Sequence, residues 1–390
     1  MNQTDSLKSH FNRIRQRAII VGVVALVLMG LSAALSTEQF FRSYLFAYLF
    51  WFGITIGCLA VLMLHHLVSG GWGFVIQRLL EAGTRTLPLM VLLFVPFFFG
   101  LRELYLWARP EVVAGDEILQ QKSLYLNVPF FGMRTIGYFA IWSVFAYLLN
   151  KWSSEQDRTA NPALTNRLRN LSGPGLVFFV LTMTFAAFDW VMSLEPHWFS
   201  TIFGVVFVIG QGLVTLAFAI IAVRLLSRHE PIAGVITTKH FHDLGNLTLA
   251  FVMLWAYVAF SQFLIIWSAN LPEEITWYVH RLHGGWGVMA IALVVFHFAV
   301  PFLLLLSRKT KQRVELLARL AAAMIIMRLV DLFWIVAPNF HPEKFSIHWM
   351  DVLAPLAIGG LWLAVFVWQL QRRALLPLHD PRLKEALHHE

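Results

Sequence analysis

The sequence predicts an all-α protein that crosses a membrane about ten times, and three observations lead to this prediction. Apolar residues make up 58% of the 390 residues and charged residues only 13%, about half the charged share of a typical soluble domain. Apolar runs long enough for a membrane-spanning helix, which needs roughly 20 residues, recur along the whole chain. These runs are continuous rather than alternating, as in membrane helices. The composition therefore excludes a soluble enzyme, a secreted disulfide scaffold and a nucleic-acid-binding domain.

Ten apolar runs can be distinguished, each bounded by charged residues or by clusters of Pro and Gly. Proline residues inside the third and eighth runs, Pro88, Pro96 and Pro301, predict kinks in those helices. In chain order the predicted spans are residues 18–35, 44–67, 86–106, 130–149, 174–194, 199–225, 246–269, 285–306, 314–336 and 350–370.

Two loop segments have the pattern of short helices that lie in the headgroup plane. Residues 72–81 alternate apolar and charged side chains at helical spacing, which is typical of an amphipathic interfacial helix. Residues 117–126 show a weaker form of the same pattern on the other side of the membrane.

The distribution of lysine and arginine predicts how the chain is inserted. Of the 30 basic residues, 21 fall on the side that holds the N-terminus, two fall inside the ninth span, and seven fall on the opposite side. Basic residues in short loops concentrate on the cytoplasmic side of a membrane, so both termini are expected in the cytoplasm. The seven residues on the opposite side are Arg42, Arg102, Arg109, Lys122, Arg134, Arg281 and Lys344.

Ionisable side chains within the spans mark candidate functional positions, because each costs about 2.5–3.5 kcal/mol to insert. Asp189 lies near the outer end of the fifth span, and Glu195 and His197 follow at the rim. Asp189 either pairs with a neighbouring arginine for packing or belongs to a proton relay. Arg328 and Asp331 lie on one face of the ninth span. They either pair within their own helix, or Arg328 faces Asp189 across a wet cavity in the outer half of the bilayer.

Three histidines also lie in or beside spans. His297 is close to the midplane, where we favour a hydrogen-bonded core residue, with a proton relay as the alternative. His65 and His66 end the second span, and adjacent helical side chains point about 100° apart, so at least one should face the bundle. We reject haem ligation, because no second histidine lies at the depth of His297. With one cysteine, Cys58, and no CxxCH motif, we expect no metal site and no covalently attached haem in this chain.

Motifs distributed over essentially the whole chain resemble one known family. The most specific is the segment DWVMSLEPHW at residues 189–198. The others are HHL at 65–67 with GGWG at 70–73, RTLPLM at 85–90, ST at 200–201 before FG at 203–204, Arg328 through Asp331 to Trp334, and DP at 380–381 with EAL at 385–387. On these motifs the chain resembles the second of the two quinone-binding-type membrane subunits of bacterial alternative complex III, a quinol:cytochrome c or quinol:electron-carrier oxidoreductase. It is more distantly similar to the NrfD-like membrane anchors of polysulfide reductases.

The resemblance implies a single membrane domain with two four-helix bundles, formed by spans two to five and six to nine and flanked by spans one and ten. The corresponding segments are 1–43 for the N-terminal segment and first span, 44–194 and 195–336 for the two bundles, and 337–390 for the tenth span and a cytoplasmic tail. It also implies a place in the bacterial inner (cytoplasmic) membrane, among lipids. The partners would be a homologous NrfD-like membrane subunit, a periplasmic iron–sulfur subunit, haem c subunits and small membrane subunits.

The resemblance further implies a role in respiratory electron transport without a redox cofactor of the chain's own. Haem c and iron–sulfur clusters would belong to partner subunits and the quinol site to the homologous membrane subunit, so this chain should not catalyse alone. Complex assembly, transmembrane proton conduction and quinone interaction are the roles open to it. The candidates for a proton relay or quinone site are Asp189, Glu195, His197, Arg328, Asp331, His297, His65 and His66.

Two other functional classes remain open. One is a purely structural membrane scaffold, which predicts that replacing Asp189 and Arg328 leaves turnover and proton uptake unchanged. The other is a secondary transporter, which would be favoured by inverted repeats and short broken spans; no such repeat is apparent in the sequence.

Overall fold

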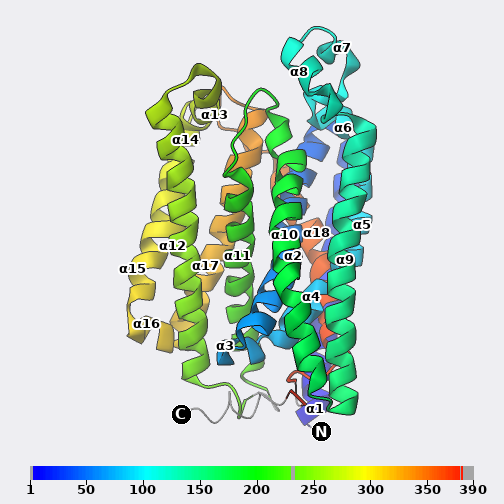
Figure 1. Cartoon of the computed structure of the whole chain (residues 1–390), viewed down its shortest axis with the longest axis vertical. Helices are drawn as coiled ribbons and strands as arrows, with labels where there is room; N and C mark the ends of the chain where they lie inside the picture. The colour runs from blue at the N-terminus through cyan, green and yellow to red at the C-terminus, as the bar shows by residue number, and fades with distance from the viewer. Residues whose placement is uncertain (1–2, 230–232, 378, 381–390) are drawn as a thin grey trace.

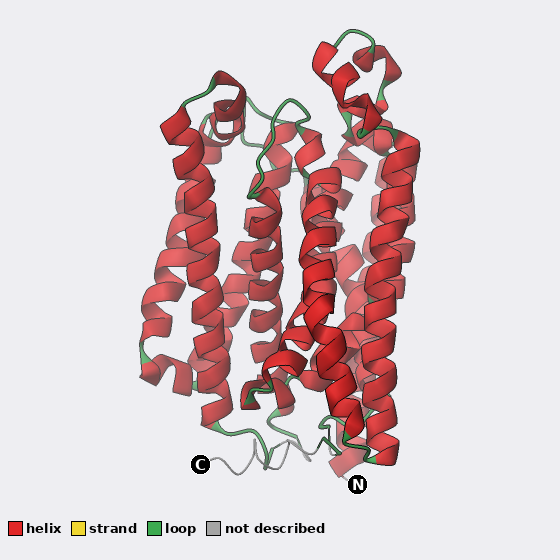
Figure 2. Ribbon diagram, viewed as in Figure 1, coloured by secondary structure: helices red, strands yellow, loops and turns green. Residues whose placement is uncertain are grey.

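The protein is a bundle of long helices joined by short loops. The structure, a computed structural model, describes residues 3–229, 233–377 and 379–380. Within these ranges it contains helices and no strand (Figure 2). Among the described residues, ten helical segments are long and apolar enough to cross a membrane, which confirms the predicted all-α, ten-span architecture.

Several of the spans are built from more than one helical segment. The first two spans are α1 (Gln3–Ala33) and α2 (Thr37–Val68). The third span comprises α4 (Gln77–Thr84), α5 (Leu87–Phe94) and the 3₁₀ turn η1 (Val95–Phe98). The fourth span is α9 (Val128–Thr159), and the fifth is α10 (Ala163–Trp190) followed by η4 (Met192–Leu194). The sixth span is α11 (Phe203–Leu226) and the seventh is α12 (Thr238–Ala269). The eighth span comprises α14 (Trp286–Ala292), the π-helix η5 (Leu293–Ala299) and α15 (Val300–Leu306). The ninth span is α17 (Val314–Val336) followed by η6 (Ala337–Asn339), and the tenth is α18 (Trp349–Leu370). The connecting helices are α3 (Gly71–Phe74), α6 (Leu101–Leu104), η2 (Leu106–Ala108), α7 (Pro110–Val113), α8 (Glu117–Gln121), η3 (Lys122–Leu124), α13 (Pro272–Leu282) and α16 (Arg308–Gln312).

The helices pack in two groups that meet along α2, α10 and α11 (Figure 1). In the first group α2 packs against α4, α5, α9 and α10, and in the second α11 and α12 pack with α15, η5 and α17. α2 is apolar on every side, and 89% of its most apolar window is buried, as expected for a helix without a polar face. α18 packs against α1 and α2 at the side of the first group.

The two ends of the bundle differ in what they carry. α1 begins and α18 ends at one end, here called the basic end, where Arg15 Nη1 donates a hydrogen bond to Gln371 Oε1 at 3.4 Å. The opposite end, here called the loop end, carries α7, α8 and α13 (Figure 1). Charged pairs placed near either end are therefore separated by most of the length of a span.

Several helices extend well beyond the predicted spans. α10 begins at Ala163, before the predicted start at Pro174, and continues through that proline. α9 and α12 are likewise longer than their apolar segments. Hydropathy marks only the part of a helix that lies in hydrocarbon, whereas backbone hydrogen bonding continues wherever a helix can be solvated. A membrane-protein helix also tolerates an internal proline when its neighbours support it.

The prediction that residues 72–81 form a surface-lying helix is wrong. All eight residues of α4 are buried, including Arg78 and Glu81, and α4 forms the start of the third span. Charged side chains can occupy this position because they are paired with one another and with groups from other helices. An amphipathic pattern is the same whether the polar face meets water or a buried polar cluster.

The first and last spans meet at a glycine contact. A Cβ atom placed on Gly22 would lie 2.8 Å from the backbone nitrogen of Leu361, and one placed on Gly360 would lie 2.4 Å from the nitrogen of Gly22. Small residues let membrane helices approach this closely. Gly30, further along α1, has no neighbouring atom within 4 Å of the same position.

We therefore expect Gly22→Leu to separate α1 from α18, at a cost of about 1–3 kcal/mol from overpacking. The control Gly30→Leu introduces the same side chain on the same helix and should leave stability unchanged. The measurement is the thermal unfolding midpoint of the purified protein in detergent. Equal midpoints for the two variants would contradict the close glycine contact.

Candidate functional site

Three clusters of buried charged residues stand out within the described spans. One lies near the loop end around Asp189, one lies on α17 around Asp331, and one lies near the basic end around Glu81. As whole residues, Glu81, Asp189 and Asp331 are at most 2% exposed. Each needs a partner, because an isolated charge in this environment is costly.

Asp189, on the last turn of α10, is held by two side chains of the neighbouring helix α9. Arg134 donates from Nε to Oδ2 at 2.8 Å and from Nη2 to Oδ1 at 2.9 Å, which makes a bidentate pair. The hydroxyl of Tyr138 donates to Oδ2 at 2.8 Å. Arg134 also donates to the carbonyl oxygen of Tyr125 and stacks over its ring at 3.8 Å. Burial, together with the nearby Asp189 carboxylate, raises the pKa of the Tyr125 phenol.

The structure thus pairs Asp189 with Arg134 and not with Arg328, the partner considered from depth alone. Arg134 lies near the start of α9 and Asp189 near the end of α10, and these antiparallel neighbours place both residues at the loop end. The sequence does carry a signal for this pairing, because two consecutive spans joined by a short loop are adjacent by default. The signal is easily missed, because Arg134 is grouped with the basic residues of the loops and not with the charged residues of the fourth span.

Arg328 and Asp331 form an ion pair within α17, between Nη1 and Oδ2, with each side chain 3% exposed. This agrees with the interpretation as an intrahelical pair. The guanidinium lies against α11, over the ring of Phe207, and a Cβ atom on Gly210 would stand 2.4 Å from its Cζ atom. Glycine at position 210 therefore makes the space that the arginine occupies.

His297 is buried in the π-helix η5. Its ring lies perpendicular to that of Trp255 on α12, with 4.4 Å between the ring centres. Neither ring nitrogen of His297 makes a hydrogen bond to another described residue. His297 therefore occupies a buried core position without the hydrogen bond that was predicted for it. A π-helical turn widens the helix by one residue, and such turns are frequent at functional sites.

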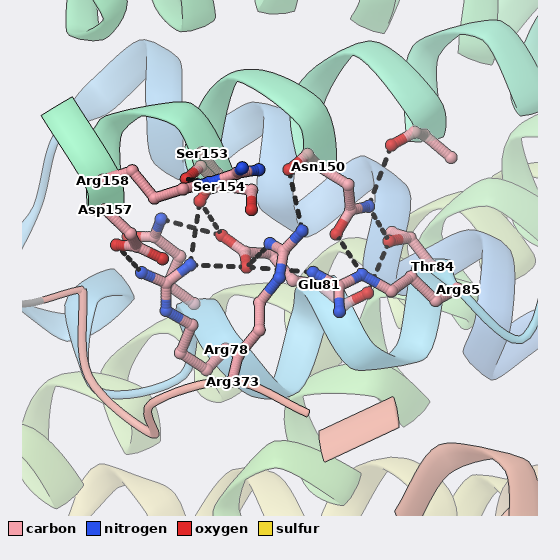
Figure 3. Close-up of polar contacts among 12 residues, drawn as sticks. Arg78, Glu81, Thr84, Arg85, Asn150, Ser153, Ser154, Asp157, Arg158 and Arg373 are labelled. Carbon is pink, nitrogen blue, oxygen red and sulfur yellow. Dashed lines mark hydrogen bonds and ion pairs between the residues drawn. The ribbon is translucent and has the colours of Figure 1, made fainter. Parts of the chain in front are cut away.

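The cluster at the basic end is centred on Glu81 and joins α4, α9 and the segment after α18 (Figure 3). Glu81 Oε2 accepts from Arg78 Nη1 at 2.7 Å and from Arg373 Nη1 at 3.0 Å. Glu81 Oε1 accepts from the hydroxyl of Ser153, on α9, at 2.6 Å. Arg78 also pairs with Asp157 at 2.5 Å. Burial lowers the pKa of Arg373 and the Glu81 carboxylate opposes that shift.

A second layer of hydrogen bonds surrounds this cluster (Figure 3). Arg85 Nε donates to Asn150 Oδ1 at 2.7 Å, and Asn150 Nδ2 donates to the hydroxyl of Thr84 at 2.8 Å. Arg373 Nη2 donates to the carbonyl oxygen of Asn150 at 3.0 Å. Sequence reasoning misses this entire site, because it places Arg78 and Glu81 at the membrane surface.

His65 and His66 both lie inside the bundle at the end of α2, at 0% and 1% exposure. The His65 ring packs edge-on against Phe74, with 4.8 Å between ring centres. A Cβ atom on Gly73 would stand 1.8 Å from His65 Nδ1, so the glycine-rich turn after α2 permits this close contact. The prediction that at least one of the two histidines faces the bundle is confirmed.

Glu195 and His197 join neither Asp189 nor Arg328, but form separate contacts at the loop end. Glu195 pairs with Arg281 at 3.3 Å and with His280 at 3.1 Å, both on α13. Burial lowers the pKa of Arg281 to about 10, against the opposing effect of Glu195. His197 contacts Asp116 at 2.6 Å on the exposed side of the loops.

The eight candidates therefore do not converge on one centre, and Arg328 and Asp331 are the two joined by an ion pair. Among the described residues no three His, Cys, Asp or Glu side chains gather as metal ligands would. The motif residues 381–387 lie outside the part of the chain that the structure describes. The three clusters place one buried carboxylate near each end of the first group of spans and a third carboxylate within the second group.

No protein-family model and no curated protein matches this chain.

Proposed function

We propose that this chain is a membrane subunit of a quinol:electron-carrier oxidoreductase of the alternative complex III type, and that its first bundle conducts protons. The observation that carries the proposal is the position of two buried carboxylates in one group of spans. Glu81 lies near the basic end and Asp189 near the loop end. Polytopic proteins retain ionisable groups at such depth chiefly for ion or proton pathways.

Hydroxyl groups continue from the Glu81 cluster towards the interior. The hydroxyls of Thr86 and Thr55 lie 2.8 Å apart, and the indole of Trp362 donates to Thr55 at 2.7 Å. At the other end Arg134 holds Asp189 through two hydrogen bonds. Asp189 then accepts a proton when Arg134, which is 10% exposed at the loop end, turns away from it.

Redox chemistry in this proposal belongs to partner subunits. The single cysteine and the absence of a CxxCH motif leave iron–sulfur clusters and haem c to other chains. The partners are a homologous membrane subunit, a periplasmic iron–sulfur subunit and haem c subunits. The excess of basic residues at the basic end supports a cytoplasmic location for that end in a bacterial inner membrane.

The test is quinol-dependent proton release by the intact complex carrying Asp189→Asn. We expect the complex to assemble and the protons released per electron to fall, because the amide cannot take up the proton. Asp116→Asn is the matched control, since it removes a loop-end carboxylate whose partner is His197 and should release protons normally.

The competing function is a purely structural scaffold, which the bridging of helices by these ion pairs favours. It predicts that Asp189→Asn assembles poorly because Arg134 is left unpaired, and that Asp189→Asn combined with Arg134→Gln restores assembly. Normal assembly together with normal proton release in Asp189→Asn would contradict the proposed relay.

A further inference from the structure

The link between the eighth and ninth spans carries a dense run of positive charge. Four of the six residues from 308 to 313 are basic and none is acidic: Arg308, Lys309, Lys311 and Arg313. No other six-residue stretch of the sequence holds as many basic residues. The run forms the short helix α16, which lies at the basic end between α15 and α17 (Figure 1).

One side of α16 is fixed to the bundle. Thr310 and Lys311 are buried, at 7% and 6% exposure. Lys311 Nζ donates a hydrogen bond to Asn246 Oδ1, near the start of α12, at 2.6 Å. At the start of α16 the hydroxyl oxygen of Ser307 accepts from the backbone nitrogen of Thr310 at 3.4 Å. The helix is therefore held in place, and its other side is presented outwards.

The outward side of α16 carries three cations, those of Arg308, Lys309 and Arg313, and all three residues are exposed. None of the three makes an ion pair within the described part of the chain. Glu315, two residues further on, is paired with two arginines from the end of α11. Asp243, on α12, contacts a histidine of its own helix. The outward side thus has a surplus of positive charge that an anionic ligand would balance.

The surface directly before this charge is apolar and open. Leu303, Leu304 and Leu306 of α15 are 64%, 37% and 55% exposed, and they belong to the eighth span. In a bilayer such side chains lie against acyl chains, and the basic residues that follow them lie at the level of the headgroups. Cations and leucines together fit a ligand that has an anionic head and apolar tails.

The basic residues at the start of α1 do not form an equivalent surface. Arg13 and Arg17 are four residues apart and lie on one side of that helix, whereas Arg15 lies on the other. Arg15 is directed towards α18, where it donates to Gln371. Only two of these guanidinium groups therefore share a side, compared with three cations within a single turn on α16.

We propose that the outward side of α16 binds the headgroup of an anionic phospholipid, whose acyl chains lie along the exposed leucines of α15. The planar guanidinium groups of Arg308 and Arg313 suit the phosphate oxygens of the headgroup, and Lys309 adds a further charge. The eighth span is the least buried of the ten, with 22% of its most apolar window buried. A lipid bound across its end would hold this span at the edge of the bundle. The proposal does not depend on proton conduction or on membership of a complex.

The experiment titrates the full-length protein, purified in detergent, with phosphatidylglycerol and follows the first bound lipid by native mass spectrometry. The variant carries Arg308→Gln, Lys309→Gln and Arg313→Gln. We expect its dissociation constant to rise about a hundredfold, because each basic side chain near an anionic headgroup contributes about fivefold. The matched control removes three exposed cations from the basic end of the first group of spans and should bind phosphatidylglycerol normally. It carries Arg158→Gln, Arg167→Gln and Arg169→Gln.

Two further ligands identify what the surface recognises. Phosphatidylcholine has the same phosphate without net charge and should bind at least tenfold more weakly. Inorganic phosphate at millimolar concentration should not displace phosphatidylglycerol, because it has no acyl chains to contact α15. Equal affinity for the two lipids, or displacement by inorganic phosphate, would overturn the proposal.

A position-specific measurement serves if the triple variant on α16 does not fold. Phosphatidylglycerol with a photoreactive headgroup should label the unsubstituted protein within residues 303–313, and label confined to other segments would overturn the proposal. Unchanged phosphatidylglycerol binding in the triple variant would overturn it as well. If that variant in addition lost the other subunits during purification, the outward side of α16 would be assigned to an acidic protein partner.

Discussion

Replacing Glu81 by leucine is expected to destabilise the protein more than any other single change considered. The substitution leaves Arg78 and Arg373, which are 3% and 19% exposed, without their common carboxylate. Removing one partner of a buried ion pair costs about 3–5 kcal/mol. The segment after α18 should also be held less firmly, because Arg373 then keeps its hydrogen bond to Asn150 but loses its ion pair with α4. The measurement is the unfolding midpoint of the purified protein, together with its yield from membranes.

Glu315→Leu is the control for this prediction. Glu315 also accepts from two arginines, Arg224 and Arg228, but it is 61% exposed, and exposed pairs contribute little. Glu81→Gln should be intermediate, since the amide keeps an acceptor for Ser153 but removes the charge. Equal midpoints for Glu81→Leu and Glu315→Leu would show that the cluster does not hold the basic end together.

The ten spans could be predicted from the sequence because their signal is local. A run of apolar residues such as the one in α11 needs no partner to identify it. Two of the predicted proline kinks also follow from local chemistry, because a proline ring removes a backbone donor. Pro96 lies in the 3₁₀ turn η1, and Pro301 lies in the first turn of α15, which directly follows the π-helix.

The partners of the buried charges could not be predicted in the same way, because they depend on tertiary contacts. Glu81 and Arg373 are 292 residues apart in sequence, and no local pattern indicates that they meet. The alternation at residues 72–81 is compatible with a headgroup-facing helix and with a buried one. Contacts with Ser153, Asp157 and Arg373, which are distant in sequence, help to offset the free-energy cost of the buried position.

Depth alone is also an insufficient guide to pairing. The sequence places Asp189 and Arg328 in the same outer half of the bilayer, yet one packs against α9 and the other against α11. Of several arginines at one depth, the partner is the one that helix packing brings within reach of the carboxylate, from an adjacent helix or from the same helix face. For Asp189 that residue is Arg134, and for Asp331 it is Arg328 on the same helix face.

The ion pair on α17 gives the second large expected effect. Arg328→Met leaves Asp331 as an unpaired carboxylate within the ninth span, and we expect a loss of about 3–5 kcal/mol. Adding Asp331→Leu removes the stranded charge, and replacing a buried ion pair by apolar residues is often neutral or stabilising. The double variant should therefore unfold at or above the midpoint of the unsubstituted protein, and the difference from the single variant measures the coupling.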